Sequence, residues 1–298
     1  MRELRGIYPA TVTPYDRDGG FDAKAMTRII RHQMAAGVHG LYVTGGTGEG
    51  VLLTVDERKR VIDTAVEEAA GRIGIIAHVG AFQTADTIAS ARHASAAGVD
   101  AIAALPPAYF FKPDELALER YYRELAAASS VPLLIYNIPQ RTGITMTPSL
   151  FEKLMSVDNI IGMKDSSGNI FSMQGFLEIG DTPPTIFSGE DTLLLSGLMA
   201  GAVGGIGLTY NLMPGIYVEL WNAFEAKDLS TAAQHQARAN QITRAFACTS
   251  DGIAATKHIM AWMGLECGLA RTPMRPLTDE EAATLRQRLE AVEFFEET

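Results

Sequence analysis

Eight short apolar runs, each followed by a helix-like stretch, constrain this chain more than any other feature. The runs cover Gly6–Pro14, Gly40–Gly46, Gly74–Gly80, Ala101–Pro107, Val131–Pro139, Ile160–Ser167, Thr185–Gly189 and Gly204–Asn211. They are almost continuously apolar instead of alternating, as expected for strands buried on both faces of a parallel sheet. Amphipathic stretches follow the runs, among them Ala23–Ala36, Val55–Ala70, Ala85–Ala97 and Asp114–Ala128.

Helix-start signals support this alternation of strands and helices. Thr54 and Glu57 have the spacing of a capping box, and Thr147 before Pro148 is typical of an N-cap and a first-turn proline. Eight strand–helix units, spaced by about 25 residues, predict a closed TIM (β/α)8 barrel of the α/β class. A doubly wound open sheet is the alternative, but no GxGxxG motif follows the first apolar run.

The last third of the chain has helix-like periodicity throughout. Its predicted helices are Tyr217–Ala226, Thr231–Ala247, Ile253–Met263 and Asp279–Phe294. No low-complexity linker precedes them. We therefore expect residues 1–212 to form a catalytic (β/α)8 barrel and residues 213–298 to form a C-terminal helical region packed on it.

Charge and hydropathy limit the classes of partner. The formal net charge is −10 and no basic run occurs, which argues against binding to a nucleic-acid backbone. No apolar run approaches the roughly 20 residues of a membrane span, and the charged N-terminus lacks the apolar segment of a secretory signal. Two isolated cysteines, Cys248 and Cys267, make no disulfide framework. These features predict a cytoplasmic protein without a membrane or nucleic-acid partner.

One of the seven lysines, Lys164, lies in a buried-strand pattern, IIGMKDSSG. The others, including Lys257, lie on helix-like or loop-like stretches with polar neighbours. Central strands disfavour lysine, and an unpaired ammonium is costly to bury. At the C-terminal end of a barrel strand, a desolvated amine would face the mouth and attack a ketone to form an imine. The pattern predicts a Schiff-base nucleophile; a surface lysine or one paired with an acid is the alternative.

Tyr136 is a second unusual residue, because it stands near the end of the apolar run VPLLIYNIP. Its hydroxyl would lie at the same mouth of the barrel and could pass protons to and from an imine. The alternative is a core tyrosine whose hydroxyl is satisfied by a protein partner.

Two segments are rich in glycine. One follows the second predicted strand, and the other contains the eighth. VTGGTGEG is not a P-loop, but the backbone N–H groups of Gly46 and Thr47 suit a carboxylate. A turn that needs glycine only for its geometry is the alternative, and Glu49 is expected to be structural. The segment GAVGGIGLTYN has no Lys or Arg beside it, which favours contact with a carboxylate or hydroxyl over phosphate.

Four motifs resemble one known family when they are taken in order: GGTGEG, YNIPQRTG, GMKDSSGN and SGED…GAVGGIG. The chain is similar to the dihydrodipicolinate synthase / N-acetylneuraminate lyase family over nearly its whole length. The resemblance implies a barrel that holds pyruvate as a Schiff base on Lys164, with Tyr136 as proton relay. It also implies no metal, no cofactor and a homotetramer. It places the pyruvate carboxylate at Gly46 and Thr47.

The resemblance further implies that Gly189 and Ile206 line the pocket. Departures from the synthase pattern concern two hydroxyls, since Gly46 replaces a threonine and Phe110 stands where a tyrosine is expected. Arg141 matches the arginine that holds the carboxylate of the second substrate, for which a guanidinium has the right two-pronged geometry.

The neuraminate lyase pattern also fits imperfectly, because Thr192 stands where a second acid is expected after Asp191. GMKDSSGN is more similar to the lyases of 2-keto-3-deoxy sugar acids and 4-hydroxy-2-oxoglutarate. Arg141 would then bind a distal carboxylate, while Ser166, Ser167, Asp191 or Thr209 would bind hydroxyls.

The leading hypothesis is a class I aldolase or lyase that joins or separates pyruvate and an aldehyde. The substrate would be a 2-oxo-4-hydroxy acid or a 2-keto-3-deoxy sugar acid. The alternative is 4-hydroxy-tetrahydrodipicolinate synthase, which condenses pyruvate with aspartate semialdehyde; a Schiff-base dehydratase and a non-catalytic barrel stay open. A metal-dependent aldolase would need clustered ligands, and most of the six histidines lack ligand spacing. His78 could face the mouth, but packing is the simpler interpretation.

Overall fold

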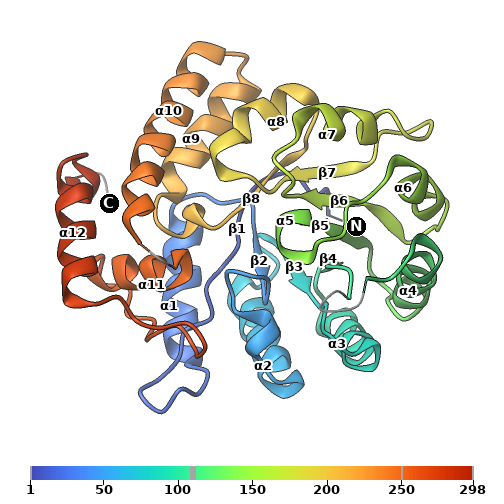
Figure 1. Cartoon of the computed structure of the whole chain (residues 1–298), viewed down its shortest axis with the longest axis horizontal. Helices are drawn as coiled ribbons and strands as arrows, with labels where there is room; N and C mark the ends of the chain where they lie inside the picture. The colour runs from blue at the N-terminus through green and yellow to red at the C-terminus, as the bar shows by residue number, and fades with distance from the viewer. Residues whose placement is uncertain (1, 108–111, 250, 297–298) are drawn as a thin grey trace.

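A computed structural model describes residues 2–107, 112–249 and 251–296. Eight parallel strands form a barrel at its centre, and helices surround it (Figure 1). The strands are β1 (Gly6–Pro9), β2 (Gly40–Val43), β3 (Gly74–His78), β4 (Ala101–Ala104), β5 (Leu133–Asn137), β6 (Ile160–Asp165), β7 (Thr185–Ser188) and β8 (Gly204–Gly207). Each lies inside one of the predicted apolar runs. The predicted TIM barrel is confirmed.

The sheet closes between its first and second strands. The hydrogen-bonded order runs β1-β8-β7-β6-β5-β4-β3-β2, which leaves β1 and β2 at the two ends. Backbone bonds join these ends: His39 N donates to Ile7 O at 2.9 Å, and Thr11 N donates to Tyr42 O at 3.0 Å. Closure removes the free edges of an open sheet and brings all eight strand ends to one mouth.

Helices follow the strands as the periodicity predicts. The barrel helices are α1 (Ala23–Ala35), α2 (Val55–Ala69), α3 (Thr84–Ala97), α4 (Glu115–Ala127), α5 (Pro139–Thr142), α6 (Pro148–Met155), α7 (Ile170–Leu177), α8 (Leu194–Ala200) and α9 (Pro214–Glu225). The capping box of Thr54 and Glu57 begins α2, and Thr147 caps α6 with Pro148 in its first turn. These caps satisfy backbone donors that a helix start leaves free.

Three further helices form the C-terminal part: α10 (Leu229–Ala245), α11 (Gly252–Trp262) and α12 (Asp279–Glu290). Figure 1 shows them on the side of the barrel where α1 and α9 lie. One apolar cluster joins Ile7 of β1 and Ile29 of α1 to Ile259 of α11 and Leu285 of α12. The tail therefore shares its core with the first β/α unit, while the division of the chain at residue 213 stays a prediction.

The barrel interior is filled by side chains and forms the floor beneath the mouth. Tyr8 and Phe187 meet edge to face at 5.2 Å between ring centroids, and Ile76, Leu134 and Ile206 belong to the same buried cluster. A filled interior leaves space for a ligand only at the C-terminal ends of the strands. Among the residues described, no helix combines the length and apolarity needed to cross a bilayer.

Candidate active site

Lys164 and Tyr136 lie side by side at the mouth. The register of β5 and β6 pairs these two residues directly, and their side chains are only 5% and 6% exposed. The Lys164 Nζ lies 4.5 Å from the centroid of the Tyr136 ring and 4.8 Å from that of Tyr42 on β2. Two aromatic faces thus flank the amine, an arrangement that also favours a cationic nitrogen such as an iminium.

Lys164 has no acidic partner in the described part of the chain. No carboxylate there lies within 4.0 Å of its Nζ, the limit for an ion pair. Buried lysines are usually paired, because an isolated ammonium loses its hydration without compensation. An amine without a carboxylate stays available for covalent chemistry.

His78, behind this pair, is held by backbone groups. Leu105 N donates to Nε2 at 3.2 Å, and Nδ1 lies 3.2 Å from Thr44 O, so the partners assign the proton to Nδ1. Burial, helped by the charges of Arg58 and Lys164, lowers the pKa of His78 to about 3. The imidazole is therefore neutral at physiological pH, with both nitrogens occupied, which fits a packing role.

A pocket of about 380 Å³ opens above Lys164. It is lined by Thr47, Tyr136, Ile138, Gln140, Arg141, Lys164, Ser166, Gly189, Glu190, Asp191, Thr192, Ile206, Leu208, Thr209 and Thr243. Of the predicted site residues, nine line it: Thr47, Tyr136, Arg141, Lys164, Ser166, Gly189, Asp191, Ile206 and Thr209. Gly46 is next to a lining residue without lining the pocket itself, and Phe110 lies outside the described residues.

Gly189 and Gly46 differ in what surrounds them. A Cβ at Gly189 would lie 2.0 Å from Ser166 Oγ and 2.9 Å from Lys164 Cε, so a side chain there would force these two side chains to move. Ser166 Oγ uses the space to donate to Gly189 O at 3.0 Å. A Cβ at Gly46 would meet nothing within 4 Å. Glycine at 189 therefore lets Ser166 and Lys164 keep their positions, whereas glycine at 46 leaves open space beside the loop.

Asp191 is fixed through one of its two carboxylate oxygens. Its Oδ2 accepts hydrogen bonds from Thr209 N at 2.7 Å and Thr209 Oγ1 at 2.6 Å, and this hydroxyl lies 2.7 Å from the Tyr217 hydroxyl. Burial raises the pKa of Asp191, and the bonds from Thr209 and the charge of Lys164 oppose the rise. No described residue donates to Oδ1, which stays available to a ligand hydroxyl.

The family model of the dihydrodipicolinate synthetase family matches residues 3–292. The chain belongs to this family. N-acetylneuraminate lyase of Mediterraneibacter gnavus is 34% identical over 98% of the chain and 93% of the relative. 4-Hydroxy-tetrahydrodipicolinate synthase of Methanothrix thermoacetophila is 31% identical over 96% of both.

Solved structures agree with this assignment. A Ruminococcus gnavus sialic acid aldolase, studied as a catalytic lysine mutant, has 33% identity and a TM-score of 0.93 over 99% of both chains. A prophage protein of the family from E. coli K12, in complex with pyruvate, has 28% identity and a TM-score of 0.92 over 98% of this chain and 99% of that one. The predicted family is confirmed, and with it the prediction of a lyase with aldolase-type chemistry.

Several residues that line the pocket above Lys164 were not predicted from the sequence. Gln140 donates to Ser167 O at 2.7 Å, and Glu190 accepts from Thr192 Oγ1 at 2.6 Å. Glu190 stands directly before Asp191 in SGED, a signal that the sequence did contain. Thr243 comes from α10 of the tail, and no local pattern indicates that a tail helix reaches the mouth.

Lys257 contradicts the sequence-based expectation of a polar helix position. It is 2% exposed, and its Nζ lies 2.6 Å from Glu49 Oε1. The expectation was wrong because the loop after β1 and the segment around Leu269 cover this side of α11. Both are brought there by the fold and are not visible in the local sequence of the helix. Glu49 is structural as predicted, and its side chain contacts Lys257 Nζ and the backbone N–H of Arg271 in the C-terminal part.

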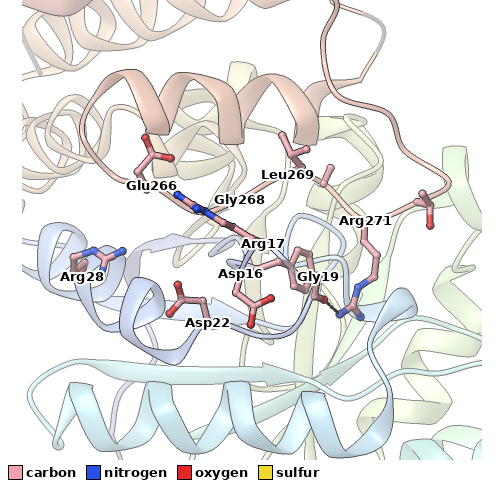
Figure 2. A pocket seen from close by; sticks show the side chains of 12 residues that line it. Asp16, Arg17, Gly19, Asp22, Arg28, Glu266, Gly268, Leu269 and Arg271 are labelled. Carbon is pink, nitrogen blue, oxygen red and sulfur yellow. Dashed lines mark hydrogen bonds between the residues drawn. The ribbon is translucent and has the colours of Figure 1, made fainter.

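A larger hollow of about 930 Å³ lies away from Lys164, between the loop after β1 and the segment before α12. Figure 2 shows Arg28, Asp22 and Glu266 around one end of it and Arg271 at the other. Its lining does not include Lys164 or Tyr136. Within the described ranges, no group of three or more His, Cys, Asp or Glu side chains is placed to hold a metal ion.

Proposed function

We propose that the chain is a class I lyase that holds pyruvate as a Schiff base on Lys164 and makes or breaks a carbon–carbon bond between pyruvate and an aldehyde. The observation that carries this proposal is the buried Lys164 amine, unpaired with any described carboxylate and flanked by the Tyr136 and Tyr42 rings. Burial without a counter-ion costs stability, and such sites persist where function needs them.

The chemistry follows from this geometry. The Lys164 Nζ attacks C2 of a 2-oxo acid, water leaves, and an iminium forms. In the cleavage direction the C3–C4 bond breaks, its electrons move towards the iminium nitrogen, and the C4 hydroxyl loses its proton as the aldehyde departs. Tyr136, whose ring centroid lies 4.5 Å from the Lys164 Nζ, would carry that proton through its hydroxyl. The enamine is then protonated at C3, and water releases pyruvate and the free lysine.

The substrate carboxylate would be bound by the backbone N–H groups of Gly46 and Thr47. Thr47 supports this placement because it lines the pocket that contains Lys164. Gly189 gives the reacting carbons room, since any side chain there would meet the Cε of Lys164.

The second half of the pocket suits a hydroxylated chain that ends in a carboxylate. Arg141 would bind the distal carboxylate in a two-pronged geometry. Asp191 Oδ1 and Ser166 Oγ would contact hydroxyls, as would polar groups near Thr209. We propose a 2-oxo-4-hydroxy acid or a 2-keto-3-deoxy sugar acid as the substrate.

A second candidate is 4-hydroxy-tetrahydrodipicolinate synthase, which would condense pyruvate with aspartate semialdehyde. Arg141 in the pocket and the 31% identical relative of that name favour it. The absence of a side chain at Gly46 disfavours it, because a proton relay through that position would need a hydroxyl.

The first test is reduction with borohydride in the presence of pyruvate, followed by intact mass measurement and peptide mapping. We expect one reduced pyruvyl group on the peptide that contains Lys164, and none in a Lys164→Ala variant. A folded protein that gains no such mass would overturn the proposal. Product assays with 2-keto-3-deoxy acids and with aspartate semialdehyde then separate the two candidates, and rapid turnover of the semialdehyde would reverse our ranking.

We also propose that the chain forms a homotetramer and works in the cytoplasm, as the resemblance implies. Large apolar side chains on the helical ring support association, since Phe171 is 85% exposed and Leu116 is 76% exposed. Native mass spectrometry should show a species about four times the 32.1 kDa chain. A monomer at micromolar concentration would contradict the proposed assembly.

A further inference from the structure

The loop proposed to bind the substrate carboxylate has an unusual backbone. Thr44 and Glu49, one at each end of the loop, have positive φ values of 57° and 55°. Residues with a Cβ rarely adopt this left-handed conformation, so surrounding contacts must hold it. The conformation of residues 44–49 therefore depends on what grips the two ends of the loop.

The barrel holds this loop at Thr44 and at Gly48. Thr44 Oγ1 donates to His78 O at 2.7 Å, and Thr13 Oγ1 donates to Gly48 O at 2.6 Å. These contacts join the loop to β3 and to the segment after β1, both of which belong to the rigid mouth. They fix the start and middle of the loop but leave Glu49 to other partners.

The C-terminal part of the chain holds Glu49 at the end of the loop. Glu49 is 2% exposed; its Oε1 lies 2.6 Å from Lys257 Nζ of α11, and its Oε2 accepts from Arg271 N at 2.7 Å. Lys257 Nζ also donates to Leu269 O at 3.2 Å and lies 4.1 Å from the centroid of the Tyr15 ring. The ammonium thus has a carboxylate, a backbone carbonyl and an aromatic face around it, and each Glu49 carboxylate oxygen has a partner in the C-terminal part.

Arg271 ties this contact to the rest of the mouth. Its guanidinium makes two bonds to the Glu57 carboxylate of α2, at 2.6 and 3.0 Å, and its carbon lies 4.3 Å from the centroid of the Tyr15 ring. It also donates to Gly19 O at 2.7 Å, the bond drawn in Figure 2. Two-pronged arginine–carboxylate bonds restrict orientation as well as distance. The tail segment that carries Leu269 and Arg271 is therefore firmly placed against the loop.

We propose that Lys257 is a positioning residue for the carboxylate site, acting through Glu49 on Thr47. Glu49 N donates to Gly46 O at 3.0 Å. Gly46 C=O and Thr47 N–H belong to one planar peptide unit, so fixing the carbonyl also fixes the direction of the N–H. The ion pair with Lys257 anchors Glu49, and Glu49 in turn orients the donor that would meet the substrate.

The inference rests on the proposed function, because it assumes that a 2-oxo acid binds with its carboxylate at Gly46 and Thr47. It adds that the C-terminal helices are part of the binding machinery. A loose Glu49 would let the Gly46 peptide rotate, which weakens carboxylate binding while Lys164 and Tyr136 stay in place on β6 and β5. The effect should appear as a higher pyruvate concentration for half-maximal Schiff-base formation. The adduct itself should still form on Lys164.

The test separates positioning from stability with two variants and a control. Lys257→Met removes the charge and leaves Glu49 buried without a counter-ion, so it will lower Tm as well as binding. Lys257→Met with Glu49→Gln removes both charges and should recover most of the lost Tm. Lys227→Met makes the same chemical change at an exposed lysine and should behave as wild type.

The measurement is the pyruvate concentration that gives half-maximal borohydride trapping on Lys164, which needs no knowledge of the aldehyde. In the double variant we expect a roughly tenfold higher concentration at near-normal Tm, with the adduct still on Lys164 at saturation. Half-saturation that returns to the wild-type value together with Tm would overturn the positioning role. A wild type that forms no adduct would instead remove the proposed function, and the inference with it.

Discussion

Lys164 and Lys257 are both buried, yet their surroundings differ in kind. Lys257, 2% exposed, has Glu49 at 2.6 Å and a backbone carbonyl at 3.2 Å. Lys164, 5% exposed, has aromatic rings on two sides and no ion-pair partner among the described residues. The comparison shows that burial alone does not identify a nucleophilic lysine. A buried amine that is paired with a carboxylate forms an ion pair and stabilises the structure instead.

The two lysines also differ in what they face. Lys164 lines a pocket of about 380 Å³, whereas Lys257 is enclosed by Tyr15, Glu49 and Leu269. Burial lowers the pKa of Lys257, and the charge of Glu49 opposes the shift. An amine that reacts with a ketone needs both access and a neutral form, and the pocket gives the first only to Lys164.

The largest expected effects, on turnover and on stability, come from two single variants in which one of these lysines is replaced by alanine. Lys164→Ala removes the nucleophile, so turnover should fall by about 10³-fold or more while Tm holds or rises. Lys257→Ala leaves the Glu49 charge buried without a counter-ion, which should cost about 3–5 kcal/mol of unfolding free energy. Turnover and urea unfolding measured on both variants check this, and a Lys257→Ala protein as stable as wild type would break the comparison.

Tyr136→Phe tests whether the hydroxyl of the tyrosine beside Lys164 is needed. The ring remains beside the amine but the hydroxyl is lost, so turnover should fall by about 10²-fold while pyruvate trapping on Lys164 persists. Tyr121→Phe, whose hydroxyl donates to Leu105 O at 3.4 Å, is the matched control. Equal turnover in the two variants would remove the proton relay from the proposed mechanism.

Two predicted site glycines, Gly189 and Gly46, provide a steric test. Gly189→Ala places a methyl group 2.9 Å from Lys164 Cε and 2.0 Å from Ser166 Oγ, so the reacting amine must move. Half-maximal trapping should need roughly tenfold more pyruvate. Gly46→Ala meets no atom within 4 Å and should stay within about twofold of wild type. The reverse order would show that the carboxylate loop, and not the space around Lys164, limits binding.

The smallest effect concerns the tail that carries Lys257. The hydrogen bond from Arg271, with bonds from Thr54, lowers the pKa of Glu57 to about 2 from its ordinary value of 4.5. The unfolded chain therefore takes up a proton at higher pH than the folded chain. The stability contributed by this carboxylate is complete above pH 4.5 and is lost as pH falls towards 2.

Glu57→Gln should lower Tm at pH 7 by a few degrees and make the loss of Tm on acidification shallower. Glu67→Gln, on the exposed side of the same helix, is the control and should keep the wild-type slope. Identical slopes for the Glu57→Gln variant and wild type would mean that the Arg271 contact does not stabilise the tail.

The sequence predicted the fold well because its signals are local. Continuous apolar runs fixed the strands, and the capping residues Thr54 and Thr147 fixed helix starts that the structure reproduces. Lys164 and Tyr136 stood out because each ends an apolar run, and the parallel barrel brings strand ends together at one mouth. Their neighbours Thr47, Gly189 and Asp191 followed from motifs placed after the strands.

Other parts of the site depend on contacts between distant segments. Arg271 and Glu49 are 222 positions apart, and Thr243 reaches the pocket from a tail helix. Helical periodicity states which residues share a face but not which element covers that face, so Lys257 was assigned to the surface. The sequence by itself determined the barrel and the family and singled out Lys164 as the candidate nucleophile, since strand order and motif position suffice for them. Only the tertiary structure decided which buried charges are paired, because the free energy of a buried charge is set by what the fold places beside it.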